Sequence, residues 1–501
     1  MEKKRYLIGI DLGTTGVKII LVNIEGNIIC SITEEYPLIT PRPGWAEQNP
    51  MDWWQATSKG IKKILSSSKI NGNQILCIGL TGQMHGSVFL DSHNKIIYPA
   101  ILWCDQRTRK ECEEINNLIG KEKIFEITCN PVLTGFQAPK IIWLKNNHRK
   151  IYDKVKKILL PKDYIRFCLT GEFATDVSDA SGTSLFDVRN RIWSKEILEK
   201  LNILPEMLPV SYESNEITGK ITRQAEKITG LLEGTPVIAG AGDQAAGGIG
   251  SGIVETGLVS VSLGTSGVVF AYSDKVFVDP KGRLHTFCHA IPGKWHLMGV
   301  MLSAGGSLRW FRDIMKEKSY NIITGQADQI PPGSEGLLFL PYLAGERTPY
   351  SNPNARGVFF GLSLKHTKSH MARAVMEGVT FGLKDSIEIM KEIGLPLGKE
   401  FRTSGGGGKS PFWAQMQADI FNKNIERLQS EEGPAYGAAL LAGTGIKVFP
   451  EIEKTCKKFI KRKDVFHPDK KTRIIYEKFY PLYKKIYDDL KNSFDILSNL
   501  V

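Results

Sequence analysis

A six-residue turn, Leu12-Gly13-Thr14-Thr15-Gly16-Val17, occurs a second time almost letter for letter as Leu263-Gly264-Thr265-Ser266-Gly267-Val268. Each copy lies between two runs rich in β-branched residues, at 5–10 and 17–22 for the first and at 258–263 and 268–272 for the second. Such runs around a glycine-rich turn predict a β-hairpin. Because the strand context is repeated together with the turn, the sequence indicates a duplicated domain.

The segment after the first hairpin predicts a mixed α/β module. A third strand is expected after Glu25-Gly26-Asn27, a helix over 51–65 begins near Asn49-Pro50, and a buried strand follows at 75–81. Three hairpin-linked strands, a helix and another strand differ from the plain alternation of a doubly wound sheet.

The boundary between the two modules is expected in the glycine-rich segment 240–257, of which residues 240–252 suit a hinge. We therefore predict an N-terminal domain over 1–248 and a C-terminal domain over 249–501. In the second domain, helical spacing of apolar residues predicts helices over 369–392 and 411–421.

Composition excludes several classes of protein. The chain has 501 residues, of which 42% are hydrophobic and 24% charged, so it can bury a large core and is neither disordered nor a small disulfide-rich protein. Its net charge of +12 is concentrated toward residues 447–501, where aromatic residues recur at helical spacing. The face of a packed terminal helix explains this charge, and no recognised nucleic-acid motif accompanies it.

The sequence predicts no secretory signal and no membrane span, and its cysteines are spaced as in reduced proteins, so a cytoplasmic location is expected. The apolar run 6–10 is too short for a secretory signal, and the uncharged run 256–273 reads as strand, turn and strand rather than a membrane span. The eight cysteines form no C-x-x-C pair, which is typical of reduced thiols.

The paired turns predict a phosphate site. Their backbone N–H groups and hydroxyls can hold phosphate, although a single turn would more simply be a plain hairpin. Asp11 precedes the first copy, whereas Ser262 takes that place in the second. One carboxylate beside two phosphate-binding turns indicates Mg²⁺, which prefers one or two carboxylates together with phosphate oxygens.

Two glycine-rich tracts resemble nucleotide-binding motifs but depart from the residue pattern that each motif requires. The tract 403–410 has Thr403 where a Walker loop needs its first glycine, and Pro411 follows it. The tract 240–245 carries Asp243 inside its loop, where a carboxylate would repel the pyrophosphate of a dinucleotide. Asp243 is instead a candidate catalytic carboxylate at the end of a strand, with a helix N-cap as the alternative.

His85 is a candidate ligand contact because it follows the predicted strand 75–81, with an ordinary loop histidine as the alternative. His285, Cys288 and His289 could suggest a transition metal, but no second cluster completes the ligand set.

Six motifs resemble the FGGY carbohydrate kinases, which belong to the actin, Hsp70 and hexokinase superfamily, and the resemblance extends from Tyr6 to about Tyr487. The motifs are Gly9-Ile10-Asp11-Leu12-Gly13-Thr14-Thr15, Gly44-Trp45-Ala46-Glu47-Gln48, Gly82-Gln83-Met84-His85-Gly86, Trp103-Cys104-Asp105-Gln106-Arg107, Gly242-Asp243-Gln244-Ala245-Ala246-Gly247 and Gly345-Glu346-Arg347-Thr348-Pro349. Within the family, the chain is most similar to the enzymes that phosphorylate D-xylulose. The resemblance implies two ribonuclease-H-like α/β domains with an interdomain cleft, and the reaction ATP + D-xylulose = ADP + D-xylulose 5-phosphate.

The resemblance also implies roles for individual residues. Asp243 would be the general base toward the ketose C5 hydroxyl, and Asp11 would orient Mg²⁺. The sugar would contact Met84 and His85, with Gln83, Trp103, Asp105 and Gln244 as further candidates. The residues expected around ATP are Gly13, Thr14, Thr15, Gly264, Thr265, Gly305, Gly306, Gly405, Gly406 and Gly407.

Two positions depart from the family pattern, Gln137 near the expected sugar site and Ser410 near the adenosine loop. The motif Met84-His85-Gly86 argues against glycerol, whereas Gln137 keeps another ketose or polyol open. An ATP-driven binding protein of the actin or Hsp70 type is the alternative from another class. A small-molecule sugar and ATP are the expected partners, without nucleic acid or membrane; a homodimer is one alternative for the assembly state.

Overall fold

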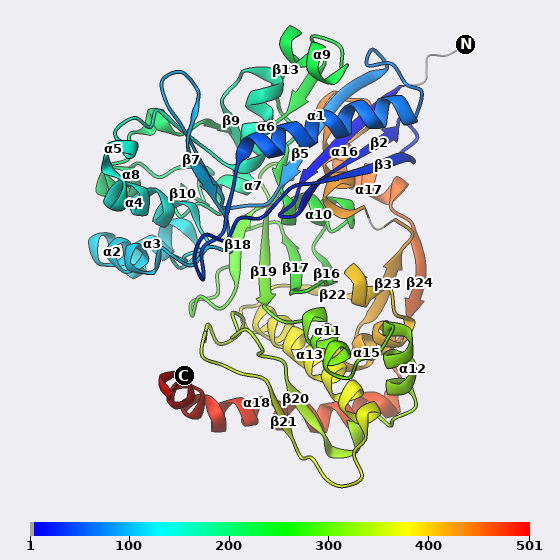
Figure 1. The fold of residues 1–501 in the computed structure, drawn as a ribbon. Coiled ribbons are helices and arrows are strands. Elements are labelled where there is room, and N and C mark those ends of the chain that lie inside the picture. The colour runs from blue at the N-terminus through cyan, green and yellow to red at the C-terminus, as the bar shows by residue number, and fades with distance from the viewer. Residues whose placement is uncertain (1–4, 431, 501) are drawn as a thin grey trace.

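Two seven-stranded sheets form the centres of two lobes in the computed structural model, which describes residues 5–430 and 432–500 (Figure 1). The path of the first sheet is β13 (Ile217–Lys220), β14 (Pro236–Ile238), β5 (Ile75–Gly82), β1 (Tyr6–Leu12), β2 (Gly16–Asn23) and β3 (Ile28–Glu35), and β15 (Ala241–Gly242) also pairs with β5. The second sheet runs β18 (His285–Cys288), β19 (Trp295–Met301), β17 (Gly267–Ser273), β16 (Gly257–Leu263), β22 (Leu397–Ser404), β23 (Asn424–Leu428) and β24 (Arg462–Phe466).

The two sheets repeat one local topology. β1 pairs antiparallel with β2 and parallel with β5, and β16 pairs antiparallel with β17 and parallel with β22. The repeated sequence forms the bend of each hairpin, as predicted. The α/β fold with mixed sheets that the sequence indicated is confirmed.

Helices cover the outer faces of both sheets. α1 (Pro50–Ser67) packs on β2 and β3 and begins where predicted, because the Asn49 side chain accepts a hydrogen bond from the Met51 N–H. In the second lobe, α13 (Lys368–Glu392) and α15 (Pro411–Phe421) match the predicted helices. The long α18 (Lys470–Leu500) runs along the end of this lobe (Figure 1). No helix among residues 5–430 and 432–500 combines the length and the apolar character that crossing a bilayer requires.

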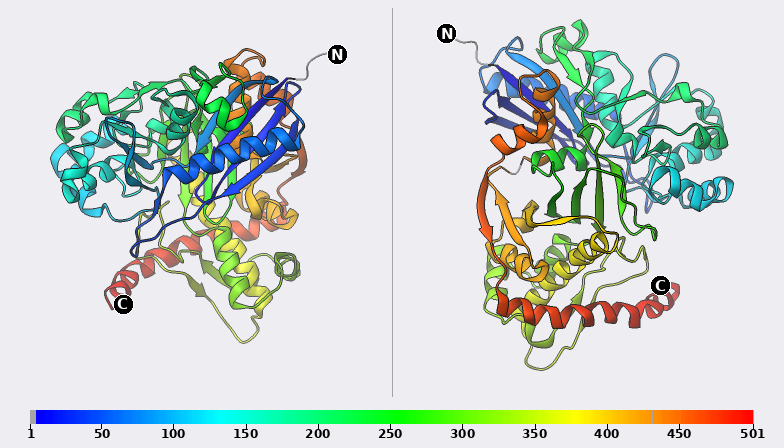
Figure 2. Two further views of the ribbon diagram at one scale, coloured as in Figure 1. Left: turned by 45° about the horizontal axis from the view of Figure 1, so that its top comes forward. Right: turned by 180° about the vertical axis from the view of Figure 1, so that it is seen from behind.

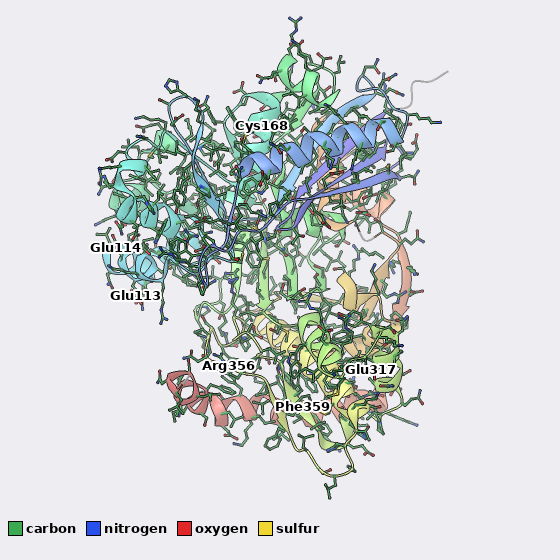
Figure 3. All side chains as sticks on the ribbon, in the orientation of Figure 1. Glu113, Glu114, Cys168, Glu317, Arg356 and Phe359 are labelled. Carbon is green, nitrogen blue, oxygen red and sulfur yellow. The ribbon has the colours of Figure 1, made fainter. Side chains whose placement is uncertain are left out.

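An insertion extends sideways from the first lobe. It contains a four-stranded sheet of β4 (Glu47–Gln48), β7 (Ile96–Ile101), β6 (Ser87–Leu90) and β8 (Lys157–Leu159), and the helices α2 (Arg109–Ile119) and α4 (Gln137–Asn147). The helix α6 (Pro161–Thr170) packs on β5 and α1 of the first lobe, and α7 (Val177–Ala180) contacts β15 and β18. Figure 3 marks Glu113 and Glu114 on α2 of this insertion, and Arg356 and Phe359 in the second lobe.

Two helices lie between the sheets. α10 (Asp243–Gly250) follows β15, and α16 (Gly433–Gly445), from late in the chain, packs against α10, β1 and β5 (Figure 2). Gly9 and Gly79 permit this packing, because a Cβ at either position would collide with the α16 backbone. The boundary predicted at 248/249 lies inside α10, and a segment assigned to the second domain covers the first sheet.

Candidate active site

Two carboxylates meet at the end of the central strand β5. Asp11 on β1 and Ala241 on β15 both pair with Thr81, so Asp11 and the α10 residue Asp243 lie on opposite sides of β5. Burial raises the pKa of Asp243 to about 7, and the charge of Asp11 adds to this rise. Burial likewise raises the pKa of Asp11 to about 6, although Lys18 opposes the shift. The site therefore disfavours two negative charges in the absence of a cation.

This pair fits a magnesium ion that is shared with phosphate. Among the described residues, no group of three or more His, Cys, Asp or Glu side chains could hold a metal ion by itself. Mg²⁺ is commonly held by one or two carboxylates, with phosphate oxygens and water as the other ligands. Asp11, beside the first glycine-rich turn, offers a carboxylate of this kind.

The first turn is braced from beneath by buried polar side chains. The Gln48 amide donates to the Thr14 carbonyl at 2.7 Å, and the Gln83 amide donates to Gln48 Oε1 at 3.1 Å. Gln83 is only 2% exposed, so it supports the turn rather than facing the cleft. Trp103 is 39% exposed and donates its indole N–H to Thr14 Oγ1 at 3.0 Å, which places an open aromatic face beside the turn.

His85 is held in one tautomer. Its Nδ1 lies 2.6 Å from the Gly182 carbonyl oxygen, and because a carbonyl only accepts, Nδ1 carries the proton. The ring stacks on Phe136 at 4.6 Å, and burial lowers its pKa well below the usual value. Lys140 Nζ donates to the His85 carbonyl at 2.8 Å and supports a backbone with φ of +69°. Nε2 of a neutral His85 is therefore an acceptor.

Met84 brings the predicted sugar motif beside the predicted base. It is 4% exposed, and its side chain fills the space in which a Cβ on Gly242 would lie. Gly242 immediately precedes Asp243, whose carboxylate also interacts with Gln244. Met84, His85, Asp243 and Gln244 are therefore gathered at one place in the first lobe.

Asp105 does not fit the sugar contact proposed for it. It is 0% exposed, its Oδ2 accepts from the Ala46 N–H at 2.6 Å, and both oxygens pair with Arg107. Arg107 also pairs with Glu47 at 2.7 Å and lies over the Trp45 ring at 3.6 Å. The charge of Asp105 is thus used to join two sequence motifs inside the protein.

The second lobe holds a cavity of about 820 Å³, which is large enough for a nucleoside. Six of the predicted ATP residues line it: Gly264, Thr265, Gly305, Gly306, Gly406 and Gly407. Gly405 instead lines a neighbouring cavity of about 390 Å³, together with Asp243 and Gln244. This neighbouring cavity connects the nucleotide side of the site to the predicted base.

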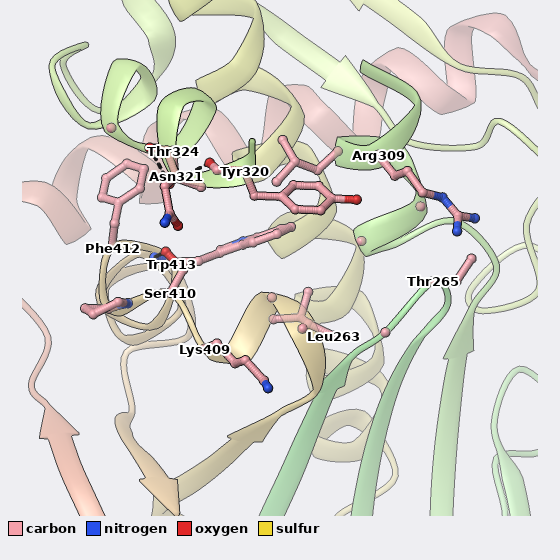
Figure 4. A pocket seen from close by; sticks show the side chains of 18 of the residues that line it. Leu263, Thr265, Arg309, Tyr320, Asn321, Thr324, Lys409, Ser410, Phe412 and Trp413 are labelled. Carbon is pink, nitrogen blue, oxygen red and sulfur yellow. Dashed lines mark hydrogen bonds between the residues drawn. The ribbon is translucent and has the colours of Figure 1, made fainter. Parts of the chain in front are cut away.

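Side chains that the motifs did not indicate form much of the larger cavity. Tyr320 from α12 (Tyr320–Asp328) lies above Trp413 from α15, with Arg309 near Thr265 and Phe412 at the other end (Figure 4). No pattern in the sequence indicated Tyr320, because no helix over α12 is predicted from the sequence. For Trp413, the predicted helix start at Pro411 was a usable signal.

Both departures from the family pattern have structural roles. The Gln137 amide donates to the Gly86 carbonyl at 3.1 Å and to the Leu159 carbonyl at 3.4 Å, so it supports the loop that carries His85. Ser410 caps α15, because its hydroxyl accepts from the Trp413 N–H at 3.3 Å. Neither residue alters the two central carboxylates.

Duplicated α/β lobes, paired glycine-rich turns, two carboxylates on either side of the end of β5 and a nucleoside-sized cavity in one lobe define a phosphotransferase of the two-domain, actin-like ATPase class. The chain belongs to the FGGY family of carbohydrate kinases. The N-terminal domain of that family matches residues 6–250, and the C-terminal domain matches residues 259–446.

Individual relatives are similar over nearly their whole length. A xylulose kinase from Lactococcus lactis subsp. lactis is 42% identical over 99% of this chain and 98% of its own, and one from Bacillus subtilis is 40% identical over 97% and 98%. Solved structures include a ligand-bound xylulose kinase from Lactobacillus acidophilus, 30% identical with a TM-score of 0.93 over 98% of this chain and 100% of its own. A gluconate kinase from the same organism is equally similar, at 30% identity and a TM-score of 0.93 over 99% and 100%.

Proposed function

We propose that this carbohydrate kinase transfers the γ-phosphoryl group of ATP to the C5 hydroxyl of D-xylulose. The observation that carries the proposal is the near full-length identity of about 40% with xylulose kinases. The placement of Met84 and His85 beside Asp243 supports it, because the acceptor hydroxyl must lie within reach of the base.

Asp243 acts as the general base in this proposal. A carboxylate with a pKa raised to about 7 is largely ionised at slightly basic pH and still takes a proton readily. His85 accepts a hydrogen bond from a sugar hydroxyl through Nε2, which orients the ketose without adding charge. Phosphoryl transfer requires mainly the positioning of the reactants and the neutralisation of charge, so the protein need not form a covalent intermediate.

Asp11 and the two turns hold the phosphate end of ATP. Mg²⁺, when bound beside Asp11, neutralises charge on the transferring phosphoryl group. The two glycine-rich turns lie in opposite lobes, so closure of the lobes brings both turns toward the nucleotide and excludes water as a competing acceptor. The N–H groups of Gly305 and Gly306 bond to the carbonyls of Gly264 and Thr265 and fix the second turn.

Coupled ADP-release assays test the proposed substrate. The panel contains D-xylulose, D-ribulose, L-ribulose, glycerol, gluconate and no sugar, each with ATP and Mg²⁺. We expect turnover selective for D-xylulose. Preference for gluconate or another sugar would reassign the substrate within the family, and sugar-independent ADP release would contradict the kinase assignment.

Replacing His85 by alanine should raise the KM for the sugar about 2- to 13-fold, because one buried hydrogen bond is worth about 0.5–1.5 kcal/mol. The affinity for ATP should stay within about twofold of wild type, since the nucleoside cavity lies in the other lobe. Steady-state kinetics with both substrates measures the change. An equal loss for sugar and ATP would place His85 outside the sugar site.

The sugar kcat/KM should decline as the pH falls below about 7, because protonation of Asp243 removes the base. The raised pKa places this loss near neutral pH, about three units above the usual range of an aspartate. His85 stays neutral over the same range and adds no second step. A profile that is flat from pH 8 to 5.5 would contradict this role for Asp243.

We place the reaction in the cytoplasm. All eight cysteines are free thiols, and five of them are buried. Free thiols persist in a reducing compartment.

A further inference from the structure

Residues 176–184, around α7, contact three parts of the site at once. The Ser178 hydroxyl lies 3.1 Å from the N–H of Gly242, which precedes the proposed base. The Gly182 carbonyl accepts from His85 Nδ1 at 2.6 Å, and the Ser181 hydroxyl accepts from the Cys288 N–H of β18 at 3.2 Å. One short segment therefore joins the base, the sugar motif and the second sheet.

Ser178 has a fixed hydrogen-bond direction. Its hydroxyl donates to Asp176 Oδ2 at 2.5 Å, so its oxygen is left to accept from Gly242. The same Asp176 oxygen accepts from the Ser178 N–H at 2.8 Å and from the Ser214 hydroxyl at 3.1 Å. Ser178 and Asp176 are both 0% exposed, so water does not replace any of these bonds.

Asp176 is anchored by a buried charge cluster. Lys162 Nζ lies 2.9 Å from Asp176, 2.7 Å from Asp163 and 3.3 Å from Asp179. Arg166, one turn further along α6, pairs with Asp163 at 2.5 Å. All five side chains are 0% exposed.

The same cluster holds the strand before the base at a second point. The Arg166 guanidinium donates to the Ala239 carbonyl, so residues 239–242 are bonded at both ends. Backbone bonds to Glu216 and Ser214 and pairing with β5 also hold residues 239–242, but Gly240 has φ of +71°, and glycine gives the chain extra conformational freedom there. Gly242 also packs against Met84, so a shift of this stretch would move the base relative to the sugar motif.

We propose that Ser178 is a positioning residue for phosphoryl transfer, which rests on the function proposed above. Its hydroxyl links Asp176 of the buried charge cluster to the N–H of Gly242. This link keeps the Asp243 carboxylate in a fixed position relative to a sugar held by His85. The role is indirect, since Ser178 touches neither sugar nor nucleotide. Misplacement of a reacting group by about 1 Å can cost about 100-fold in rate.

Ser178→Ala removes this link. We expect kcat to fall about 10- to 100-fold, with the KM values for sugar and ATP within about threefold of wild type. Ser178→Thr keeps the hydroxyl and should recover most of kcat. A parallel rise of the sugar KM, or a kcat that Ser178→Ala leaves unchanged, would overturn the proposal.

Thr229→Ala is a matched control. Thr229 is also 0% exposed, and its hydroxyl donates to the Ala225 carbonyl at 2.7 Å and accepts from the Leu231 N–H at 3.2 Å. It lies on α9 (Arg223–Thr229) and has no bond to residues 239–242 before the base. We expect it to lower the melting temperature about as much as Ser178→Ala while kcat is retained. An equal loss of kcat in both variants would show a general effect of stability and overturn the proposal.

Combination with Asp243→Asn gives a readout that does not require the threonine variant to fold. If Ser178 acts through the base, Ser178→Ala should add less than a twofold loss in the Asp243→Asn background. A full additional loss would overturn the proposal. All variants are assayed with the sugar that the wild type uses best, so a different sugar preference would contradict the proposed substrate and leave this test intact.

Discussion

Asp243→Asn should give a folded protein that binds ATP but turns over about 10²- to 10⁴-fold more slowly than wild type. A general base contributes about this factor, and asparagine keeps the size of the side chain while removing its ability to take a proton. ADP release at saturating sugar measures turnover, and calorimetric titration measures ATP binding. The residual activity should lose the step near pH 7 and keep only a decline near pH 6, where Asp11 takes up a proton.

Asp385→Asn is the matched control for this experiment. Burial raises the pKa of Asp385 to about 7, as it does for Asp243, but Asp385 lies on α13 and bonds to the Tyr480 hydroxyl at 2.6 Å. Its replacement should leave turnover within a few-fold of wild type. Near-normal turnover of Asp243→Asn would contradict the assignment of the base.

Lys162→Met should lower the free energy of unfolding by about 3–5 kcal/mol, the usual cost of removing one partner from a buried ion network. Lys162 is 0% exposed and neutralises carboxylates of Asp163, Asp176 and Asp179. Without it, those carboxylates lie buried with Arg166 as the remaining cation of the cluster. Denaturation in urea, followed by circular dichroism, measures the loss.

Lys59→Met provides the comparison at the surface. Lys59 pairs with Glu34 at 2.6 Å, but its side chain is 62% exposed, and ion pairs of this kind add little to stability. We expect an unfolding midpoint close to that of wild type. A loss for Lys162→Met no larger than that for Lys59→Met would show that the cluster is dispensable for stability.

The sequence indicated the parts of the site that depend on local chain geometry. The two turns, the strand that carries Asp11 and the strand end beside His85 follow from patterns of about ten residues, and the structure contains them where expected. Asp243 could be singled out because a carboxylate is out of place in a dinucleotide loop. These residues can be predicted from local sequence alone, without information on contacts between distant parts of the chain.

Other features depend on tertiary packing and left no local pattern. Tyr320 reaches the nucleoside cavity only because α12 packs on α13, and the burial of Asp105 depends on Ala46, which is remote in sequence. No sequence motif distinguishes Ser178, because its bond to Gly242 forms only in the folded chain. The positions of these three residues depend on their burial and on their hydrogen-bond partners. Neither property can be predicted from the spacing of residues in the sequence.

The position of α16 has a consequence for synthesis of the chain. The inner face of the first sheet is covered by a helix that the ribosome makes long after the sheet's first strand, since β1 begins at Tyr6 and α16 begins at Gly433. Until that helix emerges, apolar side chains beside Gly9 and Gly79 stay exposed in the nascent chain. We therefore expect the core of the first lobe to be completed only after the residues of α16 have been synthesised.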